Sequence, residues 1–273
     1  MKVLRLKLKQ PTAHYRIPFT FSRRHTYPIP PYSTVIGFIC NILGIKNQEE
    51  EKFKNLKNGL SLAIYGKFDS ITKEYIWLRN LEREAHINRF GSETNRIIDQ
   101  IPEHPGEQIP TRIDVLENVN LIIYIYHPDE KFLENLKETI KNPSERIYPL
   151  HLGRAEDLIL FDNEINEAIK IIEININEKE PYYGNFAYFT WLPSPENIKK
   201  KFYEEEDYKN FFRMVKGSFH LITSFYEIKE GIRDFKYIPV KLFEQGSFYF
   251  DFYKPFEFIN DKELKIPLFF PEL

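Results

Sequence analysis

The stretch HTYPIPPYSTVIGFICNILG, residues 25–44, joins a proline-rich, aromatic segment directly to a strongly apolar one. A residue that precedes proline is disfavoured in the α region, so the approach to the apolar segment is predicted to be extended. Ser33 and Thr34 are residue types that cap helices, and Gly44 is a typical C-terminal stop. The stretch therefore predicts an extended lead-in followed by a helix that runs to about Leu43.

The start of this helix is a candidate phosphate site. Free N–H groups at a helix N-terminus bind anions, and Arg23 and Arg24 lie close by in the sequence. In this interpretation the residues at the junction, Tyr32, Ser33 and Thr34, face the phosphate. The alternative is architectural, with Ser33 capping the helix and Tyr32 packing in the core. The sequence leaves both interpretations open.

Apolar periodicity along the rest of the chain predicts an α+β fold. Pro11 is expected to end the first strand, and Pro128 to lie in the first turn of the last helix. The order strand, helix, strand, strand, helix, strand is that of the ferredoxin-like split βαβ unit. The expected strands are 2–9, 60–68, 75–83, 120–127 and 157–162, and the expected helices are 33–43, 48–58 and 127–142.

Two regions depart from this simple pattern. Residues 85–111 lack a sustained period, and a loop of that length inside a compact domain is usually functional or disordered. From about residue 165 the chain changes to aromatic strands, one amphipathic stretch at 196–216 and an expected hairpin that crosses residues 244–246. We therefore expect an N-terminal ferredoxin-like domain, 1–164, with an insertion at about 85–111, and a smaller, mostly β C-terminal domain, 165–273.

Charge is distributed unevenly along the chain. The formal net charge is −2, yet residues 1–48 hold eight lysines and arginines and no acidic residue. The 30 remaining basic residues face 40 acidic ones, which gives the rest of the chain a charge of −10. A basic end on an acidic body can attract a polyanion, and the alternative is an ordinary solvated basic face.

Between residues 79 and 112 every basic side chain is arginine. The planar guanidinium suits bidentate phosphate contacts and stacking on bases. Six acidic residues share the segment, so pairing within the chain is the alternative. Phe90 is a candidate stacking residue, with core packing as its alternative. The arginines are Arg79, Arg83, Arg89, Arg96 and Arg112.

No catalytic or metal-binding signature is evident. The seven histidines form no HExxH or HxH spacing, and the single cysteine, Cys40, excludes an internal disulfide and a Cys-rich zinc site. We therefore expect no metal and no cofactor. His14, Tyr15, His25 and Tyr27 are a candidate set for metal-independent RNA cleavage, although their spacing is not diagnostic. A single cysteine and the absence of an 18-residue apolar run favour a cytoplasmic protein without a membrane span.

Two longer motifs carry a resemblance to a known family. The stretch AHYRIPFTFSRRHTYPIPPYSTVIGFICNILG, residues 13–44, and the block LGRAEDL, residues 152–158, resemble signature motifs of the fifth CRISPR-associated (Cas) protein family. The segment TRIDVL, residues 111–116, stands where that family often has a basic strand after a long loop. These motifs cover residues 1–160, and length and motif style lean towards type I-B.

The resemblance implies a RAMP-superfamily protein with a ferredoxin-like, RNA-recognition-type domain. Most members are subunits of type I Cascade surveillance complexes in antiviral defence. They grip the 5′ handle of the CRISPR RNA (crRNA) beside the backbone and large subunits, and they meet target DNA only indirectly, through the complex. The family's long loop acts as a thumb against the guide RNA, and residues 85–111 are the candidate thumb here.

These arguments together predict a non-catalytic RNA-binding subunit. The first alternative is a metal-independent endoribonuclease that processes CRISPR repeat RNA, and the second is a protein-interaction domain without RNA contact. Arg154 of LGRAEDL is a candidate phosphate contact, with a turn held by its own salt bridge as the alternative. The candidate RNA-binding residues are Arg16, Arg23, Arg24, Tyr32, Ser33, Thr34, Arg79, Arg83, Arg89, Phe90, Arg96, Arg112 and Arg154.

Overall fold

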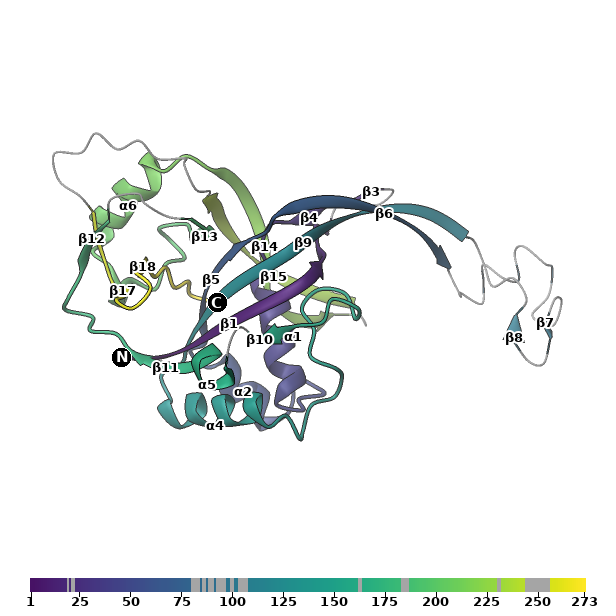
Figure 1. The fold of residues 1–273 in the computed structure, drawn as a ribbon, viewed down its shortest axis with the longest axis horizontal. Helices are drawn as coiled ribbons and strands as arrows, with labels where there is room; N and C mark the ends of the chain where they lie inside the picture. Colours follow the sequence, from purple (N-terminus) through teal and green to yellow (C-terminus); the bar gives the residue numbers. More distant parts are fainter. Residues whose placement is uncertain are drawn as a thin grey trace.

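The chain folds as a mixed α/β protein built on one large antiparallel sheet, as the computed structural model shows (Figure 1). The α+β class expected from periodicity is confirmed. The structure describes residues 1–18, 20, 23–79, 84, 87, 91, 97–98, 101–102, 108–161, 164–182, 187–229, 232–243 and 256–273.

The N-terminal part contains the ferredoxin-like strand order. One edge of this part of the sheet is formed by two short strands, β10 and β11, which both pair with β1. Strand β9 lies between β1 and β5. In chain order this is fourth, first, third, second, the arrangement of the split βαβ unit. The strands are β1 (Lys2–Ala13), β5 (Ser61–Lys67), β9 (Gln108–Tyr126), β10 (Leu160–Phe161) and β11 (Ile169–Glu173). The helices are α1 (Tyr32–Ile42), α2 (Glu51–Lys57), α4 (Glu130–Lys141) and α5 (Ile165–Ala168).

Both faces of the central strands are buried, which explains their nearly continuous apolar sequence. In β9, Ile123 and Ile125 face the core shared with α1, α2 and α4, whereas Tyr124 and Tyr126 face a second, aromatic core. This second core includes Tyr208 and other side chains of α6 (Glu205–Met214). Because successive strand residues point to opposite faces, each central strand supplies both cores at once.

Several predicted boundaries are wrong. β1 continues to Ala13, because its ladder with β9 skips Pro11 and resumes at Thr12. The skipped residue of β9 is Asn118, which has a φ of 53°. Proline is tolerated where its missing N–H is not required by a ladder. Pro128 precedes α4, whose N-cap is Asp129, and the Asp129 side chain accepts from the Lys131 N–H.

A long two-stranded ribbon extends from the body (Figure 1). It consists of β6 (Ser70–Arg79) and residues 108–117 of β9, paired from Ser70 opposite Glu117 to Arg79 opposite Gln108. We call these two segments the arm. The end of the region predicted to be a loop, residues 108–111, is therefore strand. Within the intervening residues, β7 (Ile97–Ile98) pairs with β8 (Ile101–Pro102).

Short strands surround the base of the arm. β3 (Arg23–Arg24) runs parallel to β9 and pairs with nothing else among the described strands. β2 (Tyr15–Arg16) pairs with β4 (Thr26–Tyr27). The basic and aromatic segment that precedes α1 is therefore folded against the arm.

The C-terminal part continues the same sheet. β13 (Phe189–Pro193) pairs with β5, and β15 (Ile232–Phe243) lies between β13 and β14 (Ser218–Lys229). The division at residue 165 thus stays a prediction, and the sheet has no break there. The remaining elements are β12 (Glu180–Tyr182), η1 (Lys200–Phe202), β16 (Phe256–Phe258), β17 (Asn260–Asp261) and β18 (Ile266–Pro267).

The predicted hairpin across residues 244–246 is wrong for β15. Residues 240–242 of β15 have β13 on one side and β14 on the other, so neither edge is open there to the strand expected to follow the turn. The turn and all but the last residue of the second expected strand, residues 244–255, lie outside the described part of the chain.

Not all of the N-terminal positive charge is available to a ligand. The Arg5 guanidinium is fully buried. Its Nη1 lies 2.7 Å from Asp261 Oδ2, and its Nη2 lies 3.0 Å from Glu263 Oε2. Burial opposes its charge, but hydrogen bonds to the two carboxylates outweigh this and raise the Arg5 pKa. Arg5 therefore links the first strand to the C-terminal segment, a structural role that the local charge pattern did not reveal.

Candidate nucleic-acid interface

Four of the predicted arginines gather at the base of the arm: Arg16, Arg23, Arg24 and Arg112. Arg23 stands opposite Arg112 in the parallel pairing of β3 with β9. Arg24 follows on β3, and its pKa is lowered first by burial and then by the charge of Arg16. We call these four residues the arginine cluster.

Carboxylates of the described residues leave most of the arginine cluster unneutralised. Asp114 Oδ1 lies 3.4 Å from Arg23 Nη2, and Asp114 Oδ2 accepts a hydrogen bond from His25 Nδ1 at 2.7 Å. Among the residues that the structure describes, no carboxylate forms an ion pair with Arg16, Arg24 or Arg112, and the buried Nε of Arg24 has no partner. Like charges held together without compensating carboxylates favour an anionic ligand.

The cluster spans the edge formed by β3. Neighbouring strand residues point to opposite faces, so Arg23 and Arg24 project to opposite sides of this edge. Arg23 and Arg112 share the side that carries Tyr75 of β6, which is paired with Arg112. A phosphate chain that crosses this edge can therefore meet guanidinium groups on both sides.

The structure contradicts the predicted exposure of Tyr32 at the start of α1, whereas a phosphate contact of Ser33 and Thr34 stays a prediction. The Tyr32 side chain is fully buried, and the residue before the helix, Pro31, provides the N-cap without a side-chain hydrogen bond. Ser33 Oγ lies 2.6 Å from Thr223 Oγ1, and the Thr34 N–H donates to the Pro31 carbonyl. Packing of Tyr32 in the core, the architectural alternative, describes this junction. Neither Ser33 nor Thr34 caps the helix.

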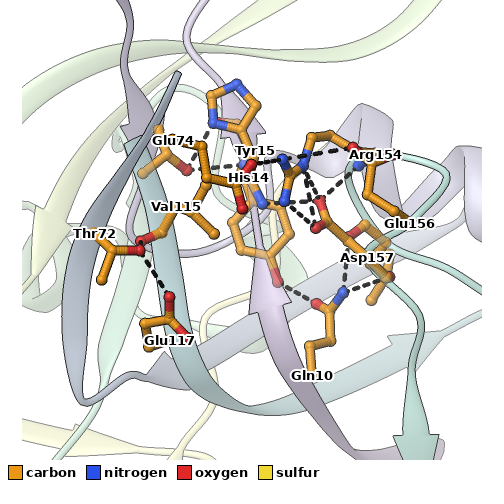
Figure 2. A network of polar contacts seen from close by, with 12 residues as sticks. Gln10, His14, Tyr15, Thr72, Glu74, Val115, Glu117, Arg154, Glu156 and Asp157 are labelled. Atoms are coloured by element: carbon orange, nitrogen blue, oxygen red, sulfur yellow. Dashed lines mark hydrogen bonds and ion pairs between the residues drawn. The ribbon is translucent and has the colours of Figure 1, made fainter. Parts of the chain in front are cut away.

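Arg154 forms a structural clamp. Its Nη2 donates to Asp157 Oδ1 at 2.8 Å, and its Nη1 donates to Oε2 of Glu74 in β6 at 2.7 Å. Figure 2 shows both contacts. The Asp157 carboxylate is fully buried and also accepts from the backbone N–H groups of His14 and Arg154. LGRAEDL thus joins the end of β1 to the arm, and the salt-bridge alternative describes Arg154 better than a phosphate contact.

Gly153 has a backbone that only glycine adopts easily. Its φ is +102°, and a Cβ there would lie 2.8 Å from the His14 carbonyl oxygen and from Asp157 Oδ2. Gly153→Ala is therefore expected to lower the free energy of unfolding by about 1–3 kcal/mol, measured by urea denaturation.

Gly37→Ala is the control for that substitution. Gly37 is exposed in α1, and a Cβ there meets nothing within 4 Å, so close approach of α1 to the sheet does not require this glycine. Alanine is expected to stabilise the helix by about 0.5–1 kcal/mol. Equal losses from both substitutions would contradict the assigned role of Gly153.

The remaining predicted residues belong to the arm and the segment beyond it. Arg79 is the last residue of β6 and is paired with Gln108. Four positions lie outside the described residues: Arg83, Arg89, Phe90 and Arg96. Their assignment to RNA binding stays a prediction, as does the thumb role of the region around them.

Two aromatic residues of the arm were missed by the sequence interpretation. Tyr75 and Trp77 are 59% and 58% exposed, and their rings meet edge to face with centroids 6.1 Å apart. We call them the aromatic pair. Alternation of TKEYIWLR was the available signal, because it places both rings on one face of the strand.

Three of the four residues proposed for RNA cleavage are buried. Tyr15 and Tyr27 are buried, with the Tyr15 hydroxyl hydrogen-bonded to Gln10. His14 is buried as well, its Nδ1 donates to the Asp114 carbonyl oxygen, and burial lowers its pKa. Of the four residues only His25 is substantially exposed. The described residues also include no group of three or more His, Cys, Asp or Glu positioned to hold a metal ion.

Comparison with known proteins identifies the family. Residues 3–171 match the model of the family described as CRISPR-associated protein (Cas_Cas5). Because this match spans more than half of the chain, the protein belongs to that family. A comparison with curated proteins finds no match.

A solved structure shares the fold at low sequence identity. A chain of a CRISPR RNA-guided surveillance complex superposes with a TM-score of 0.51 and 11% identity, over 94% of this chain and 91% of that one. A CRISPR protein from Archaeoglobus fulgidus gives a TM-score of 0.46 and 12% identity, over 99% of each chain. In the part of the chain that the structure describes, no helix is long and apolar enough to cross a membrane.

Proposed function

We propose that the chain is a non-catalytic RNA-binding subunit of a type I CRISPR surveillance (Cascade) complex in antiviral defence. It holds the 5′ handle of crRNA and contacts the backbone and large subunits, and it meets target DNA only through the complex. The observation that carries the proposal is the arginine cluster, which gathers four guanidinium groups at the base of the arm. Family membership and the fold shared with a surveillance-complex chain support it.

The chemistry of the cluster suits a single RNA strand. Arginine contacts phosphate with two parallel N–H donors, and the edge position of β3 lets the strand pass over both of its faces. Binding through phosphates releases counterions, so the logarithm of the association constant falls linearly with the logarithm of salt concentration. Each phosphate contacted on a single strand contributes a slope of about −0.7.

The test is assembly and binding with the intact chain. Co-expression with backbone and large subunits and a crRNA is expected to yield a complex that contains this chain and protects the handle from nuclease. A complex that assembles without the chain, with the handle equally protected, would overturn the proposal. Retention of the chain with an unprotected handle would favour the protein-interaction alternative.

The endoribonuclease alternative is weaker, because Tyr15, Tyr27 and His14 of its candidate set are buried. When the purified chain is incubated with repeat RNA in EDTA, we expect intact RNA on a denaturing gel. A His25→Ala variant is the control for any trace of cleavage. A specific product that forms with the native chain and is lost in the variant would establish the nuclease function instead.

A further inference from the structure

The aromatic pair stands on an exposed face of the arm, away from the clamp. Ile71, Lys73, Tyr75 and Trp77 alternate along β6 and share one face, whereas Glu74 points to the other face and binds Arg154 (Figure 2). Two large rings that are each more than half exposed contribute little to the core. Neither core packing nor the arginine cluster explains their exposure.

The aromatic pair is aligned with guanidinium groups. Tyr75 is the cross-strand partner of Arg112, and Arg112 is the partner of Arg23, so the three side chains form one row across β6, β9 and β3. Trp77 lies two residues further along the arm, opposite Pro110. Phosphate-binding groups and π faces therefore occur side by side, at the spacing of neighbouring strands, about 4.8 Å.

We propose that this face of the arm is a stacking site for unpaired bases of a single RNA strand. The proposal rests on the proposed function and extends it by assigning a base-binding surface to Tyr75 and Trp77. Arg112 and Arg23 hold the phosphates, and one or two bases stack on the exposed rings. Such stacking tolerates any base, because every base has a π face. A protein partner would use the same rings, but the row of arginines favours RNA.

Trp77 offers a direct spectroscopic test. The other tryptophan, Trp191, is 1% exposed and donates its indole N–H to Pro30, so Trp77 accounts for the solvent-accessible emission. The difference in fluorescence between the native chain and Trp77→Phe reports Trp77 alone. Titration with a single-stranded RNA is expected to quench this emission. An abasic strand with the same phosphates is expected to bind more weakly and to leave the emission unquenched.

Affinity provides the second readout. Trp77→Ala is expected to weaken single-stranded RNA binding roughly 5- to 150-fold, the range for loss of one stacked base. Ile71→Ala is the matched control on the same face of β6, because Ile71 is 53% exposed and has no ring. It is expected to change the affinity less than about 2-fold.

The outcomes separate this inference from the proposed function. RNA binding that depends on the arginine cluster but leaves Trp77 unquenched and Trp77→Ala unimpaired would overturn the stacking site and leave the proposed function standing. Absence of any RNA binding would overturn both. Loss of partner subunits from the Trp77→Ala complex, with native RNA affinity, would assign the face to protein contact and also overturn the stacking site.

Discussion

Asp157→Ala is expected to lower the free energy of unfolding by about 3–5 kcal/mol, the usual cost of removing one partner from a buried charge pair. The Asp157 carboxylate has no exposed surface and accepts from two backbone N–H groups and from the Arg154 guanidinium. Its loss leaves Arg154, which is 15% exposed, without the buried carboxylate that accepts from its Nε and Nη2. Urea denaturation followed by circular dichroism measures the change.

Glu156→Gln is the control for this prediction. Glu156 lies 3.5 Å from the same guanidinium, but its side chain is 65% exposed, and exposed pairs contribute about 0–1 kcal/mol. A small change at Glu156 with a large one at Asp157 is the expected pattern. Equal changes at the two positions would show that the clamp is an ordinary surface pair.

Neutralising three members of the arginine cluster should produce the largest effect on binding. For Arg16→Gln, Arg24→Gln and Arg112→Gln together, we expect a loss of about a thousandfold in affinity for single-stranded RNA, at about 1.4 kcal/mol for each contact. The slope of log affinity against log salt should become shallower by about 2, because each lost phosphate contact removes about 0.7. Filter binding at four or more salt concentrations measures both quantities.

An equal change of charge elsewhere provides the control. Lys200, Arg213 and Lys216 are exposed in and near η1 and α6. Helix α6 lies at the opposite end of the molecule from the arm (Figure 1). Replacing all three by glutamine removes the same charge and should leave the slope unchanged. If this triple variant matches the arginine-cluster variant, general attraction between the chain and RNA explains the binding and the cluster has no special role.

The amino-acid sequence predicted the central strands and helices because the patterns that indicate them lie within short segments of the chain. All of the apolar run 120–127 except His127 lies in β9, and α4 follows an acidic N-cap at Asp129. Gly44 ends α1 with a φ of +69°, as its position indicated. The strand order of the ferredoxin-like unit follows from the sequence of these elements, so it was predictable once they were placed.

The features that sequence missed depend on distant partners. Arg154 is bound by Glu74, 80 residues earlier in the chain, and Arg5 by Asp261, 256 residues later. The sequence alone does not show whether a charged side chain is paired with a carboxylate that is distant in the chain or is available to a ligand. Tyr32 illustrates the same point for packing, because only the assembled core shows that its ring is buried.

The candidate site was partly predictable for the same physical reason. The arginines of residues 16–24 stand out as a local charge cluster, and Arg112 as an arginine after a long loop. Arg112 lies opposite both Arg23 and Tyr75, and these pairings depend on the registers of β3 and β6 against β9. Register is set by packing across the whole sheet, and it was not contained in any one segment.

Cross-linking of bound RNA tests the location of the interface most directly. The intact chain is bound to single-stranded RNA that carries 4-thiouridine, irradiated and digested, and the attached peptides are identified by mass spectrometry. An RNA interface at the arm predicts adducts within residues 16–27, 70–79 and 108–116, around the base and face of the arm. Adducts confined to residues 196–216 near α6, with the arm unmodified, would contradict it.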